Sequence, residues 1–575
     1  MLDYRTEYAS WLASPVLTEA ERSDLLAIRD NDKEIEDRFY TALSFGTAGL
    51  RGVMGVGLNR MNGYVVAQAT QGLAELILSA GPDCAGRGVV IGYDCRHQSD
   101  VFARTAAEVL AANGIRVLLF DAMRPTPEVS FAIRHYHCIA GINVTASHNP
   151  KEYNGYKVYW EDGAQIGPEQ ANAVEACIRR TDVFAGARRC DLDDALRDGR
   201  VTMLGGETDE AFMSRVLALA VCPAEVARCA DTLKIVYTPF HGTGYKMVPE
   251  VLRREGFRHI VCEPRQMVPD GDFPTVKSPN PENKEGFADA IELARREGSD
   301  LIIGTDPDAD RVGIVVRDAS GDYVTLTGNQ VGALLLDYII SARREQGTLP
   351  AKCAAVKSIV STDMARAVAE RNGVRMCECF TGFKFIAGRI NDLAAEGYEY
   401  LLGFEESYGY LSGDHARDKD AVVASLLIAE MAAFWYNRGK TLYDALQAAF
   451  AKYGYFAERT INVVMKGADG FARMQQIMRD LHAHAPAAVG EFAVATVEDY
   501  LAGEKRSVSG ELLGATEVAG SDVLIFGLAC GVRLAVRPSG TEPKMKFYVL
   551  ASADSAAGAE SIADRVAEAA RTLTE

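Results

Sequence analysis

The stretch Gly141-Ile-Asn-Val-Thr-Ala-Ser-His-Asn-Pro150 places a hydroxyl beside an imidazole directly after an apolar run. Residues 138–144 predict a buried strand. Ser147 is therefore expected on a loop at the carboxyl end of a strand, where open α/β sheets bind their ligands. A serine with His148 and Lys157 nearby could act as a nucleophile or carry a phosphoryl group. The alternative is a turn whose polar side chains satisfy local backbone groups.

A second loop, Thr305-Asp-Pro-Asp-Ala-Asp-Arg311, has carboxylates at alternate positions. They belong to Asp306, Asp308 and Asp310. Three such groups can converge on one cation, and oxygen ligands suit Mg²⁺. An EF-hand would need Gly and Glu where Arg311 and Arg317 stand, so it is rejected. Apolar runs at 301–304 and 312–316 flank the loop, which favours a metal site over a solvated acidic turn.

Three further loops carry groups that bind anions or hydroxyls. Residues 45–52 combine glycines with one arginine, so that backbone amides and a guanidinium could face an anion. Residues 403–409 offer Glu405 and Ser407 as hydrogen-bond partners for a polyol. Residues 537–544 hold a guanidinium, two hydroxyls and an ammonium, a combination that could clamp a phosphate. A plain connection, a structural turn and a charged hairpin are the respective alternatives.

The order of predicted elements indicates several α/β units. A chain of 575 residues suggests three or four domains. Helices and strands alternate from residue 64, again from about 232 and again from about 326, which predicts wound sheets. From about 456, alternating strands and a C-terminal helix follow. Residues 421–436 are too short for a membrane span and include Glu430, so we expect a buried helix there.

Composition excludes some classes of protein. The formal net charge is −18, with 61 basic and 79 acidic residues, which argues against nucleic acid or an anionic membrane as a partner. The 12 cysteines lack zinc-type spacing and are expected as free thiols in a reducing compartment. The N-terminal residues do not resemble a signal peptide, so the expected setting is the cytoplasm. Gly439-Lys-Thr441 lacks the first glycine of a P-loop, and no dinucleotide motif follows a predicted strand.

Taken together, a serine, a metal site, a polyol site and a phosphate clamp are the equipment for phosphoryl transfer on a sugar phosphate. Four motifs, in this order, resemble those of the α-D-phosphohexomutase family, and the opening loop at 45–51 resembles its long phosphoglucomutase and phosphopentomutase branch. The four motifs are residues 145–150, 306–311, 403–407 and 537–541.

The resemblance implies an α/β fold in which three related α/β domains with mixed sheets and a smaller C-terminal α+β domain surround a central cleft. The expected boundaries are 1–220 for the phosphoserine-bearing domain, 221–325 for the metal-binding domain, 326–455 for the sugar-binding domain and 456–575 for the phosphate-binding domain.

The resemblance also implies a role for each site residue. The catalytic group is Ser147 as the phosphoserine, with His148, Lys157 and Lys419, and one of the two lysines would serve as the acid/base. The ligands of Mg²⁺ are Asp306, Asp308, Asp310 and the phosphorylated Ser147. The substrate-binding residues are Thr47, Arg51, Arg311, Thr381, Lys384, Glu405, Ser407, Arg537, Ser539, Gly540, Thr541 and Lys544.

The implied reaction interconverts glucose 1-phosphate and glucose 6-phosphate through phosphoserine and a glucose 1,6-bisphosphate intermediate, which also serves as activator. Phosphomannomutase, phosphopentomutase and glucose 1,6-bisphosphate synthase activities need the same loops and stay open. A silent sugar-phosphate sensor or a phosphatase is a further alternative. The expected partners are small sugar phosphates, and the chain is expected as a monomer or a homodimer.

Overall fold

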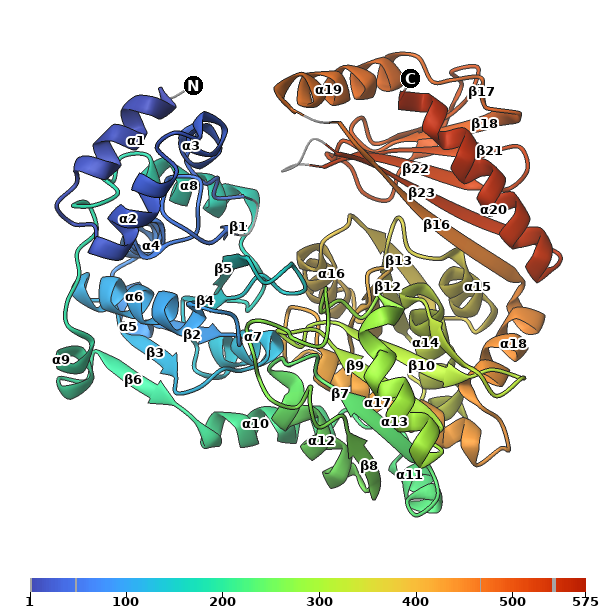
Figure 1. Ribbon diagram of the computed structural model, residues 1–575. Coiled ribbons are helices and arrows are strands. Elements are labelled where there is room, and N and C mark those ends of the chain that lie inside the picture. The colour runs from blue at the N-terminus through green and yellow to red at the C-terminus, as the bar shows by residue number, and fades with distance from the viewer. Residues whose placement is uncertain (1–2, 47–48, 466, 540–543, 575) are drawn as a thin grey trace. The chain divides into compact units, whose positions relative to one another are not determined.

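The computed structural model describes residues 3–46, 49–465, 467–539 and 544–574, without the side chains of 467–469 (Figure 1). The chain forms two compact units. Unit 1 comprises Met1–Arg317, Tyr323–Thr325 and Gly409–Asn437, and unit 2 comprises Asp318–Asp322, Leu326–Tyr408 and Arg438–Glu575. Three predicted substrate-binding residues, Thr47, Gly540 and Thr541, lie outside the described residues.

Unit 1 begins with three short helices. They are α1 (Tyr4–Ala13), α2 (Glu19–Ala27) and α3 (Asp32–Phe39). Thr18 and Glu21 form a reciprocal capping box that fixes the start of α2. Trp11, Leu25 and Phe39 are buried between the helices and hold them together.

The first sheet of unit 1 is mixed. Its strands are β1 (Gly49–Val53), β2 (Val89–Tyr93), β3 (Val117–Phe120), β4 (Ala140–Val144), β5 (Tyr153–Trp160) and β6 (Val201–Leu204), in the order β1-β5-β4-β2-β3-β6. β2, β3, β4 and β6 run parallel, whereas β5 is antiparallel to β4 and β1. This topology places the end of β4, which precedes Ser147, beside the antiparallel β5, which carries Lys157.

Helices cover both faces of this sheet. Val89 and Ile91 of β2 pack against α4 (Gly63–Ala80), α6 (Ser99–Ala112) and α8 (Pro168–Ile178), whereas Val90 packs against α7 (Thr126–His135). Successive strand residues face opposite sides, so a sheet covered twice needs a continuous apolar run. Two short helices, α5 (Cys84–Arg87) and α9 (Leu192–Arg197), complete this part of the chain.

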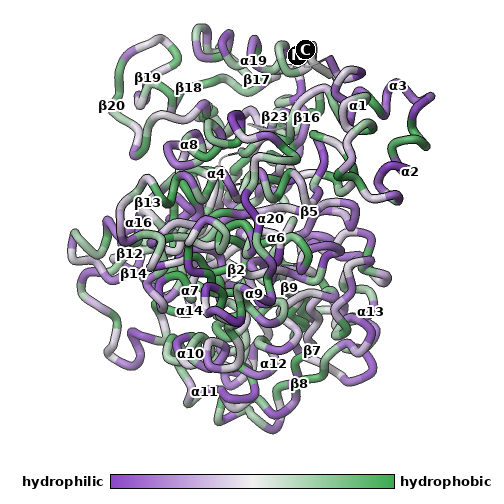
Figure 2. Tube along the Cα trace, turned by 90° about the vertical axis from the view of Figure 1, so that its left-hand side faces the viewer, coloured by the Kyte–Doolittle hydropathy of each residue, from purple (hydrophilic) through white to green (hydrophobic). Residues whose placement is uncertain are grey.

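The second sheet of unit 1 carries the acidic loop. Its strands are β7 (Lys234–Thr238), β8 (His259–Cys262), β9 (Leu301–Thr305), β10 (Val312–Arg317) and β11 (Tyr323–Leu326), in the order β11-β10-β9-β7-β8. β7 is parallel to β8 and β9, and β10 is antiparallel to β9. The associated helices are α10 (Gly206–Leu217), α11 (Pro223–Cys229), α12 (Gly244–Glu255), η1 (Lys284–Phe287) and α13 (Ala288–Glu297). In Figure 2 purple, hydrophilic segments are prominent along α13.

One helix from late in the chain also packs in unit 1. The apolar run at 421–436 forms α17 (Ala421–Tyr436), whose residues are buried from Ala421 to Phe434. It packs against α12, β9 and β10, and Figure 1 shows it in light orange beside the green strands β7 and β9. The prediction of a buried helix is confirmed. Among the described helices, none is both long and apolar enough to cross a membrane.

Unit 2 contains the third α/β sheet. Three neighbouring strands follow the order β13 (Arg375–Cys379), β12 (Cys353–Ser358), β14 (Glu399–Glu405), and β12 is parallel to both of the others. The helices are α14 (Gly328–Glu345), α15 (Asp363–Arg371), α16 (Phe383–Ala395) and α18 (Leu442–Tyr453). After β14 the chain enters β15 (Gly409–Leu411), where the segment belonging to unit 1 begins.

The C-terminal part of unit 2 is an antiparallel sheet with helices. Its main path is β16 (Tyr455–Val464), β23 (Lys544–Ala553), β22 (Arg533–Pro538), β21 (Leu524–Leu528), β18 (Phe492–Asp499), β19 (Glu504–Ser507) and β20 (Leu512–Ala515), with β17 (Ala488–Val489) paired to β18. The helices are α19 (Gly467–Ala483), α20 (Ala556–Ala570) and η2 (Arg571–Thr574). Every strand pair is antiparallel. The predicted fold class, α/β with a C-terminal α+β domain, is confirmed.

Two predicted loops are shorter than expected. β14 continues through Glu405, and β22 and β23 include Arg537 and Lys544. In the sheet Arg537 lies opposite Lys546. The pairing of β22 with β23 therefore includes Arg537, a polar residue that was predicted to lie in the loop 537–544. A polar residue at a strand end is paired as readily as an apolar one, since the ladder uses backbone groups.

Candidate active site

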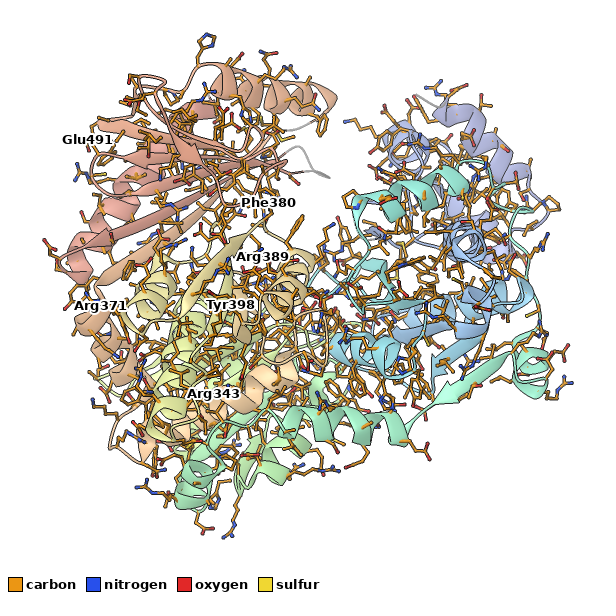
Figure 3. The ribbon with its side chains drawn as sticks, turned by 180° about the vertical axis from the view of Figure 1, so that it is seen from behind. Arg343, Arg371, Phe380, Arg389, Tyr398 and Glu491 are labelled. Atoms are coloured by element: carbon orange, nitrogen blue, oxygen red, sulfur yellow. The ribbon has the colours of Figure 1, made fainter. Side chains whose placement is uncertain are left out.

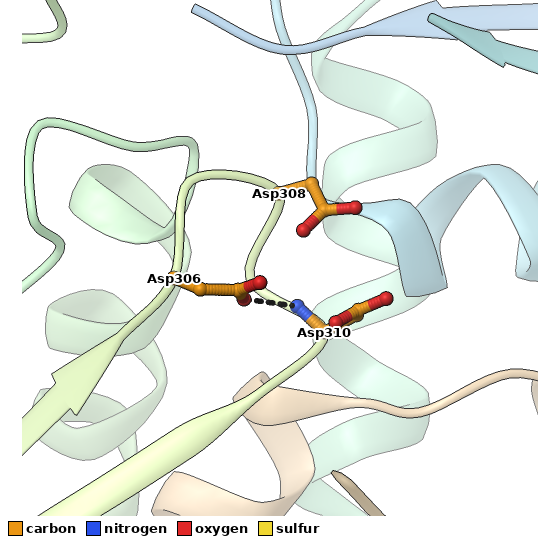
Figure 4. Close-up of side chains that lie close together, drawn as sticks. All are labelled: Asp306, Asp308 and Asp310. Atoms are coloured by element: carbon orange, nitrogen blue, oxygen red, sulfur yellow. Dashed lines mark hydrogen bonds between the residues drawn. The ribbon is translucent and has the colours of Figure 1, made fainter. Parts of the chain in front are cut away.

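The three aspartates of the acidic loop converge, as predicted. Their ligand atoms all lie within 4.8 Å of one another, and the side chains are buried (Figure 4). The loop is tight because Ala309 has a φ of 50° and Asp306 Oδ1 accepts hydrogen bonds from the backbone N–H groups of Asp310 (3.1 Å) and Arg311 (2.9 Å). Backbone donors thus hold Asp306 beside the other two carboxylates.

The donor set fits a divalent cation. Asp308 Oδ1 and Asp310 Oδ1 are buried without a hydrogen-bond partner, and such groups are costly unless something completes their coordination. Three carboxylates are the hard oxygen ligands that Mg²⁺ binds. Burial and the two neighbouring carboxylates raise the pKa of Asp306 well above its ordinary value. A cation would relieve that repulsion.

Two lysines lie beside the acidic loop. Lys157 Nζ on β5 is 2.7 Å from Asp308 Oδ2 and 3.3 Å from Asp310 Oδ2. Lys419 Nζ, just before α17, is 3.2 Å from Asp310 Oδ2. Burial opposes the charged form of Lys157, but Asp308 and Asp310 outweigh it and raise the pKa of its ammonium. Burial also opposes ionisation of Asp308, and Lys157 overcomes it, so the pKa of Asp308 is lowered.

Ser147 meets the acidic loop directly. Its Oγ donates to Asp306 Oδ2 at 2.7 Å and lies 3.1 Å from His148 Nδ1. The backbone of Ser147 has a φ of 51°, a left-handed conformation that costs a non-glycine residue about 1–3 kcal/mol. Burial, together with the cations Arg311 and Arg51, lowers the pKa of His148 well below its ordinary value, so the ring is neutral near pH 7. Ser147 and His148 therefore lie beside the acidic loop.

Two predicted arginines lie at the edge of the same group. Arg51 on β1 donates from Nη1 to Asn149 Oδ1 at 3.3 Å, which links the opening loop to the serine loop. Arg311 Nη1 lies 3.5 Å from Glu282 Oε1, and its Nε is 3.8 Å from Asp310 Oδ1. Both guanidinium groups therefore lie beside the loops that carry Ser147 and the aspartates.

The remaining predicted residues lie in unit 2. Glu405 Oε1 accepts from the backbone N–H of Gly382 at 2.6 Å, which ties the end of β14 to the turn that carries Thr381 and precedes Lys384. Burial lowers the pKa of Lys384. Ser407 follows β14 and is partly buried. A carboxylate and two hydroxyls are thus gathered at the carboxyl ends of β13 and β14.

Three residues of the predicted phosphate clamp are described: Arg537 on β22, Ser539 after it and Lys544 at the start of β23. The backbone N–H of Ser539 donates to the carbonyl of Lys544 at 2.8 Å. Burial and the carboxylate of Glu406 raise the pKa of Tyr548 on β23, and Arg537 opposes that shift. Arg537 and the carboxylates at the end of β14 therefore approach the same tyrosine within unit 2.

Sequence reasoning missed three groups that support the site. Thr126, at the start of α7, donates from Oγ1 to Asp308 Oδ2 (2.9 Å) and from its backbone N–H to the Asp308 carbonyl (2.8 Å). Thr243 donates its backbone N–H to the Pro307 carbonyl at 2.8 Å, and a Cβ on the neighbouring Gly242 would lie 2.4 Å from Pro307 Cα. The loop 238–244 had no assigned role, although its two glycines were the signal that something approaches closely.

The third missed group is Asp418, which fixes Lys419. Asp418 is buried and accepts hydrogen bonds from Lys419 Nζ (3.0 Å), Tyr159 Oη (3.0 Å) and Gln165 Nε2 (2.8 Å). It lay within the sequence stretch that contains Lys419, but only the fold shows that β5 and its following turn supply its other two partners.

Fold and site together define a class of protein: an α/β phosphotransferase with a buried acidic loop beside a serine. The chain matches the phosphoglucomutase/phosphomannomutase α/β/α domain I over residues 42–183, domain II over 210–321, domain III over 327–453 and the C-terminal domain over 461–569. The chain belongs to this family, the α-D-phosphohexomutases that its motifs predicted, and it is an enzyme of the isomerase class.

Known proteins of similar length support this membership. The chain is 37% identical over 524 residues to a phosphoglucomutase of Staphylococcus epidermidis, with 91% of this chain and 93% of the relative covered. It is 36% identical over 523 residues to a phosphoglucomutase of Staphylococcus aureus, covering 91% and 92%.

Solved structures show the same fold. One is a phosphoglucomutase/phosphomannomutase family protein from Burkholderia thailandensis, with a TM-score of 0.66 at 18% identity, covering 92% of this chain and 97% of that chain. Another is parafusin, a Paramecium phosphoglucomutase in an open form, with a TM-score of 0.66 at 18% identity, covering 92% and 96%.

Proposed function

We propose that the protein is a phosphoglucomutase, which interconverts glucose 1-phosphate and glucose 6-phosphate through a phosphoserine at Ser147. The observation that carries the proposal is the 2.7 Å hydrogen bond from Ser147 Oγ to Asp306, in the loop whose other two carboxylates have unpartnered buried oxygens. Curated relatives at 36–37% identity bear the name phosphoglucomutase, which supports glucose phosphates over other sugars.

The reaction needs one bond broken and one formed in each half. A sugar hydroxyl attacks the phosphorus on Ser147, the bond from phosphorus to Ser147 Oγ breaks, and glucose 1,6-bisphosphate results. In the second half, Ser147 Oγ attacks the other phosphorus of the bisphosphate. The bond from that phosphorus to its sugar oxygen breaks, and the isomeric monophosphate is released. The acid/base candidates are His148, Lys157 and Lys419, and the hydroxyl proton can pass only to one of them that is neutral. His148 is neutral and can accept it, whereas Lys157, held between two carboxylates, acts as an ammonium that stabilises the transferring oxygens.

The proposed metal is Mg²⁺, held by Asp306, Asp308, Asp310 and the phosphorylated Ser147. Such an ion supplies positive charge to the transferring phosphoryl group. Lys157 and Lys419 partly balance the three carboxylates, so the loop can keep its shape before the ion binds.

The substrate contacts are assigned by the chemistry of each group. Arg51, Arg311 and Thr47 would contact the transferring phosphate. The guanidinium of Arg51 adjoins the serine loop, and that of Arg311 adjoins Asp310. Thr381, Lys384, Glu405 and Ser407 would hold sugar hydroxyls. Arg537, Ser539, Gly540, Thr541 and Lys544 would bind the other phosphate. On this proposal the domains 1–220, 221–325, 326–455 and 456–575 supply the phosphoserine, the metal site, the sugar site and the phosphate clamp.

Glucose 1,6-bisphosphate would serve as activator, because it can rephosphorylate Ser147 whenever that phosphate is lost. The setting we propose is the cytoplasm. The twelve cysteines, all free thiols, support a reducing compartment.

The test compares the wild type with Ser147→Ala and with Ser79→Ala, a control on α4. We expect the wild type to carry one phosphoryl group on Ser147 by intact mass and to convert glucose 1-phosphate to glucose 6-phosphate. Ser147→Ala should lose the phosphoryl group and at least about 1,000-fold in kcat while keeping the wild-type melting temperature. Turnover by Ser147→Ala at the wild-type rate would exclude the proposal.

The same assay separates the alternatives. Faster turnover of mannose 1-phosphate or ribose 1-phosphate than of glucose 1-phosphate would identify a phosphomannomutase or a phosphopentomutase. Formation of glucose 1,6-bisphosphate from an acyl phosphate would identify a synthase.

A further inference from the structure

A buried guanidinium lies under the serine loop. The Arg96 side chain is 0% exposed. Its Nη1 donates to the carbonyls of Pro150 (2.8 Å) and Tyr153 (3.0 Å), and its Nη2 donates to the carbonyls of Ser147 (2.5 Å) and Asn149. One side chain therefore holds four carbonyls of the segment 147–153, which few groups other than a guanidinium can do.

The segment that Arg96 holds is the one in an unfavourable backbone conformation. Ser147 has a φ of 51°, and a non-glycine residue stays there only when its surroundings impose it. Its carbonyl accepts from Arg96, and its N–H donates to Thr145 Oγ1 at 2.8 Å. Thr145 Oγ1 in turn donates to Asp94 Oδ2 at 2.6 Å. The loop that follows β2 thus fixes the carbonyl of Ser147 directly through Arg96, and its N–H indirectly through Asp94 and Thr145.

The Asp94 carboxylate completes this arrangement. Asp94 is buried, its Oδ1 accepts from the backbone N–H of Arg96 (2.9 Å) and from Ser99 Oγ (2.7 Å), and its Oδ2 lies 3.4 Å from Arg96 Nε. The buried cation therefore has a buried counterion on the same loop, which lowers the cost of taking both charges out of water.

A loop that follows β8 closes over the guanidinium. The ring of Phe273 lies 5.1 Å from Arg96 Cζ, and Phe273 is itself buried. Gly271 approaches so closely that a Cβ there would be 2.8 Å from the backbone nitrogen of His97. A planar guanidinium can stack on a ring and still donate at its edge, which an ammonium cannot do.

We propose that Arg96 is a positioning residue for the phosphoryl-transfer reaction. It imposes the left-handed conformation of Ser147, and this directs Oγ at Asp306 and the metal loop. The inference rests on the proposed function. It adds that the serine loop is held in its reactive shape by the β2 loop and the Phe273 loop before substrate binds.

The test uses Arg96→Lys and Arg96→Ala, with Arg87→Lys as the matched control. Arg87 also donates to loop carbonyls, those of His137 and Cys138, but at the opposite end of β4. Arg96→Lys should lower kcat about 100-fold, because a small misplacement of a reacting group has that effect. KM for glucose 1-phosphate should stay within about threefold, since the groups assigned to bind substrate are untouched. Added guanidinium should partly restore kcat in Arg96→Ala, while Arg87→Lys keeps the wild-type kcat.

Melting temperature and intact mass accompany each rate. Arg96→Lys that turns over at the wild-type rate, or loses activity only in proportion to its unfolded fraction, would overturn the inference. If neither Arg96 variant folds, Phe273→Leu decides, because it keeps the arginine and removes the ring above it. A lower kcat at unchanged KM supports the inference, and an unchanged kcat overturns it.

The two proposals can fail separately. A wild type that does not convert glucose 1-phosphate counts against the proposed function alone. The rate at which glucose 1,6-bisphosphate phosphorylates Ser147, followed by intact mass, then compares Arg96→Lys with Arg87→Lys. A slower rate in Arg96→Lys supports the positioning role, and equal rates overturn it.

Discussion

At the scale of single residues, the site is a set of buried charges that are nearly balanced. Asp306, Asp308 and Asp310 are buried together, and Lys157 and Lys419 lie within 3.3 Å of two of them. Three carboxylates against two ammonium groups leave one negative charge, and two carboxylate oxygens have no hydrogen-bond partner. A divalent cation and a phosphoryl group of about −2 nearly cancel each other, so the two can bind together without changing this balance.

Removal of the metal should therefore stop turnover without unfolding the protein. We expect chelation to lower kcat at least about 100-fold, because the charge supplied to the transferring group is lost. Addition of Mg²⁺ should restore the rate and raise the melting temperature, since a ligand that binds only the folded state stabilises it.

Asp308→Asn should abolish the effect of Mg²⁺ on the melting temperature, whereas Asp193→Asn, an exposed control on α9, should keep it. The measurements are activity and thermal unfolding with and without Mg²⁺. An unchanged response to Mg²⁺ in Asp308→Asn would refute the assignment of this loop as the metal site.

The sequence pointed to the residues that we propose do the chemistry, but not to those that support them. Ser147 and the aspartates stand in short motifs, in which a hydroxyl or alternating carboxylates directly follow an apolar strand. Thr126, Asp418 and Arg96 carry no such pattern. Each acts through contacts to segments far along the chain, and those contacts exist only once the sheets are formed.

At the scale of elements, α17 shows how a buried helix can also carry a charge. Its residues from Ala421 to Phe434 are buried, yet it contains Glu430. The Glu430 carboxylate accepts hydrogen bonds from the backbone N–H groups of Val221 (2.9 Å) and Cys222 (2.8 Å). It thus provides acceptors for two backbone donors of the segment before α11. The sequence predicted the helix from its length and apolar character. The sequence could not show that this helix, which belongs to the alternating stretch from about residue 326, packs against the second sheet. Hydrophobic periodicity does not identify the elements against which a helix packs.

The pairing of α12 with α17 predicts a pH dependence of stability. Burial, and then the nearby Glu430, raises the pKa of Glu255 at the end of α12 to about 7. The folded state therefore binds a proton more tightly than the unfolded state, whose carboxyl titrates near its ordinary value. The free energy of unfolding should fall as pH rises from about 4.5 to 7 and level off above that.

Glu255→Gln should remove this part of the slope and be about 1 kcal/mol more stable than wild type at pH 8, a value reduced because the carboxyl is partly exposed. Glu250→Gln, on the same helix beside Arg254, serves as control and should keep the wild-type slope. Urea unfolding at pH 5 and pH 8 measures both. Equal slopes in wild type and Glu255→Gln would contradict the prediction.

At the scale of the whole molecule, unit 2 joins an α/β sheet to the C-terminal sheet through two kinds of contact. One is apolar: Phe380, labelled in Figure 3, follows β13 and packs edge-on against Tyr500, with ring centroids 6.0 Å apart. The other is ionic. Arg533 Nη1 on β22 lies 2.9 Å from Asp363 Oδ1 and 3.7 Å from Glu378 Oε1. No sequence pattern pairs these charges, because the partners are far apart along the chain.

The ionic contact is anchored by a buried lysine. Lys357 on β12 is 0% exposed, and its Nζ lies 2.8 Å from Glu378 Oε1. Burial opposes the ionised form of Glu378, but Lys357, Arg533 and Arg366 outweigh it and lower the pKa of its carboxyl to about 2. Arg533 Nη2 also lies 3.6 Å from Glu498 Oε2, so loss of Arg533 removes the cation that three carboxylates share at this junction.

Arg533→Met should therefore loosen the junction between the two sheets of unit 2. We expect a loss of about 2 kcal/mol, less than for a fully buried pair because Arg533 is 21% exposed. If the C-terminal sheet places the phosphate clamp, as proposed, KM for glucose 1-phosphate should rise several-fold while Ser147 stays phosphorylated. Arg565→Met on α20, which breaks an exposed pair with Glu491 between β17 and β18, is the control and should change neither quantity. Calorimetry, KM and intact mass measure the three effects. A variant with wild-type KM and wild-type stability would show that the apolar contact alone joins the sheets.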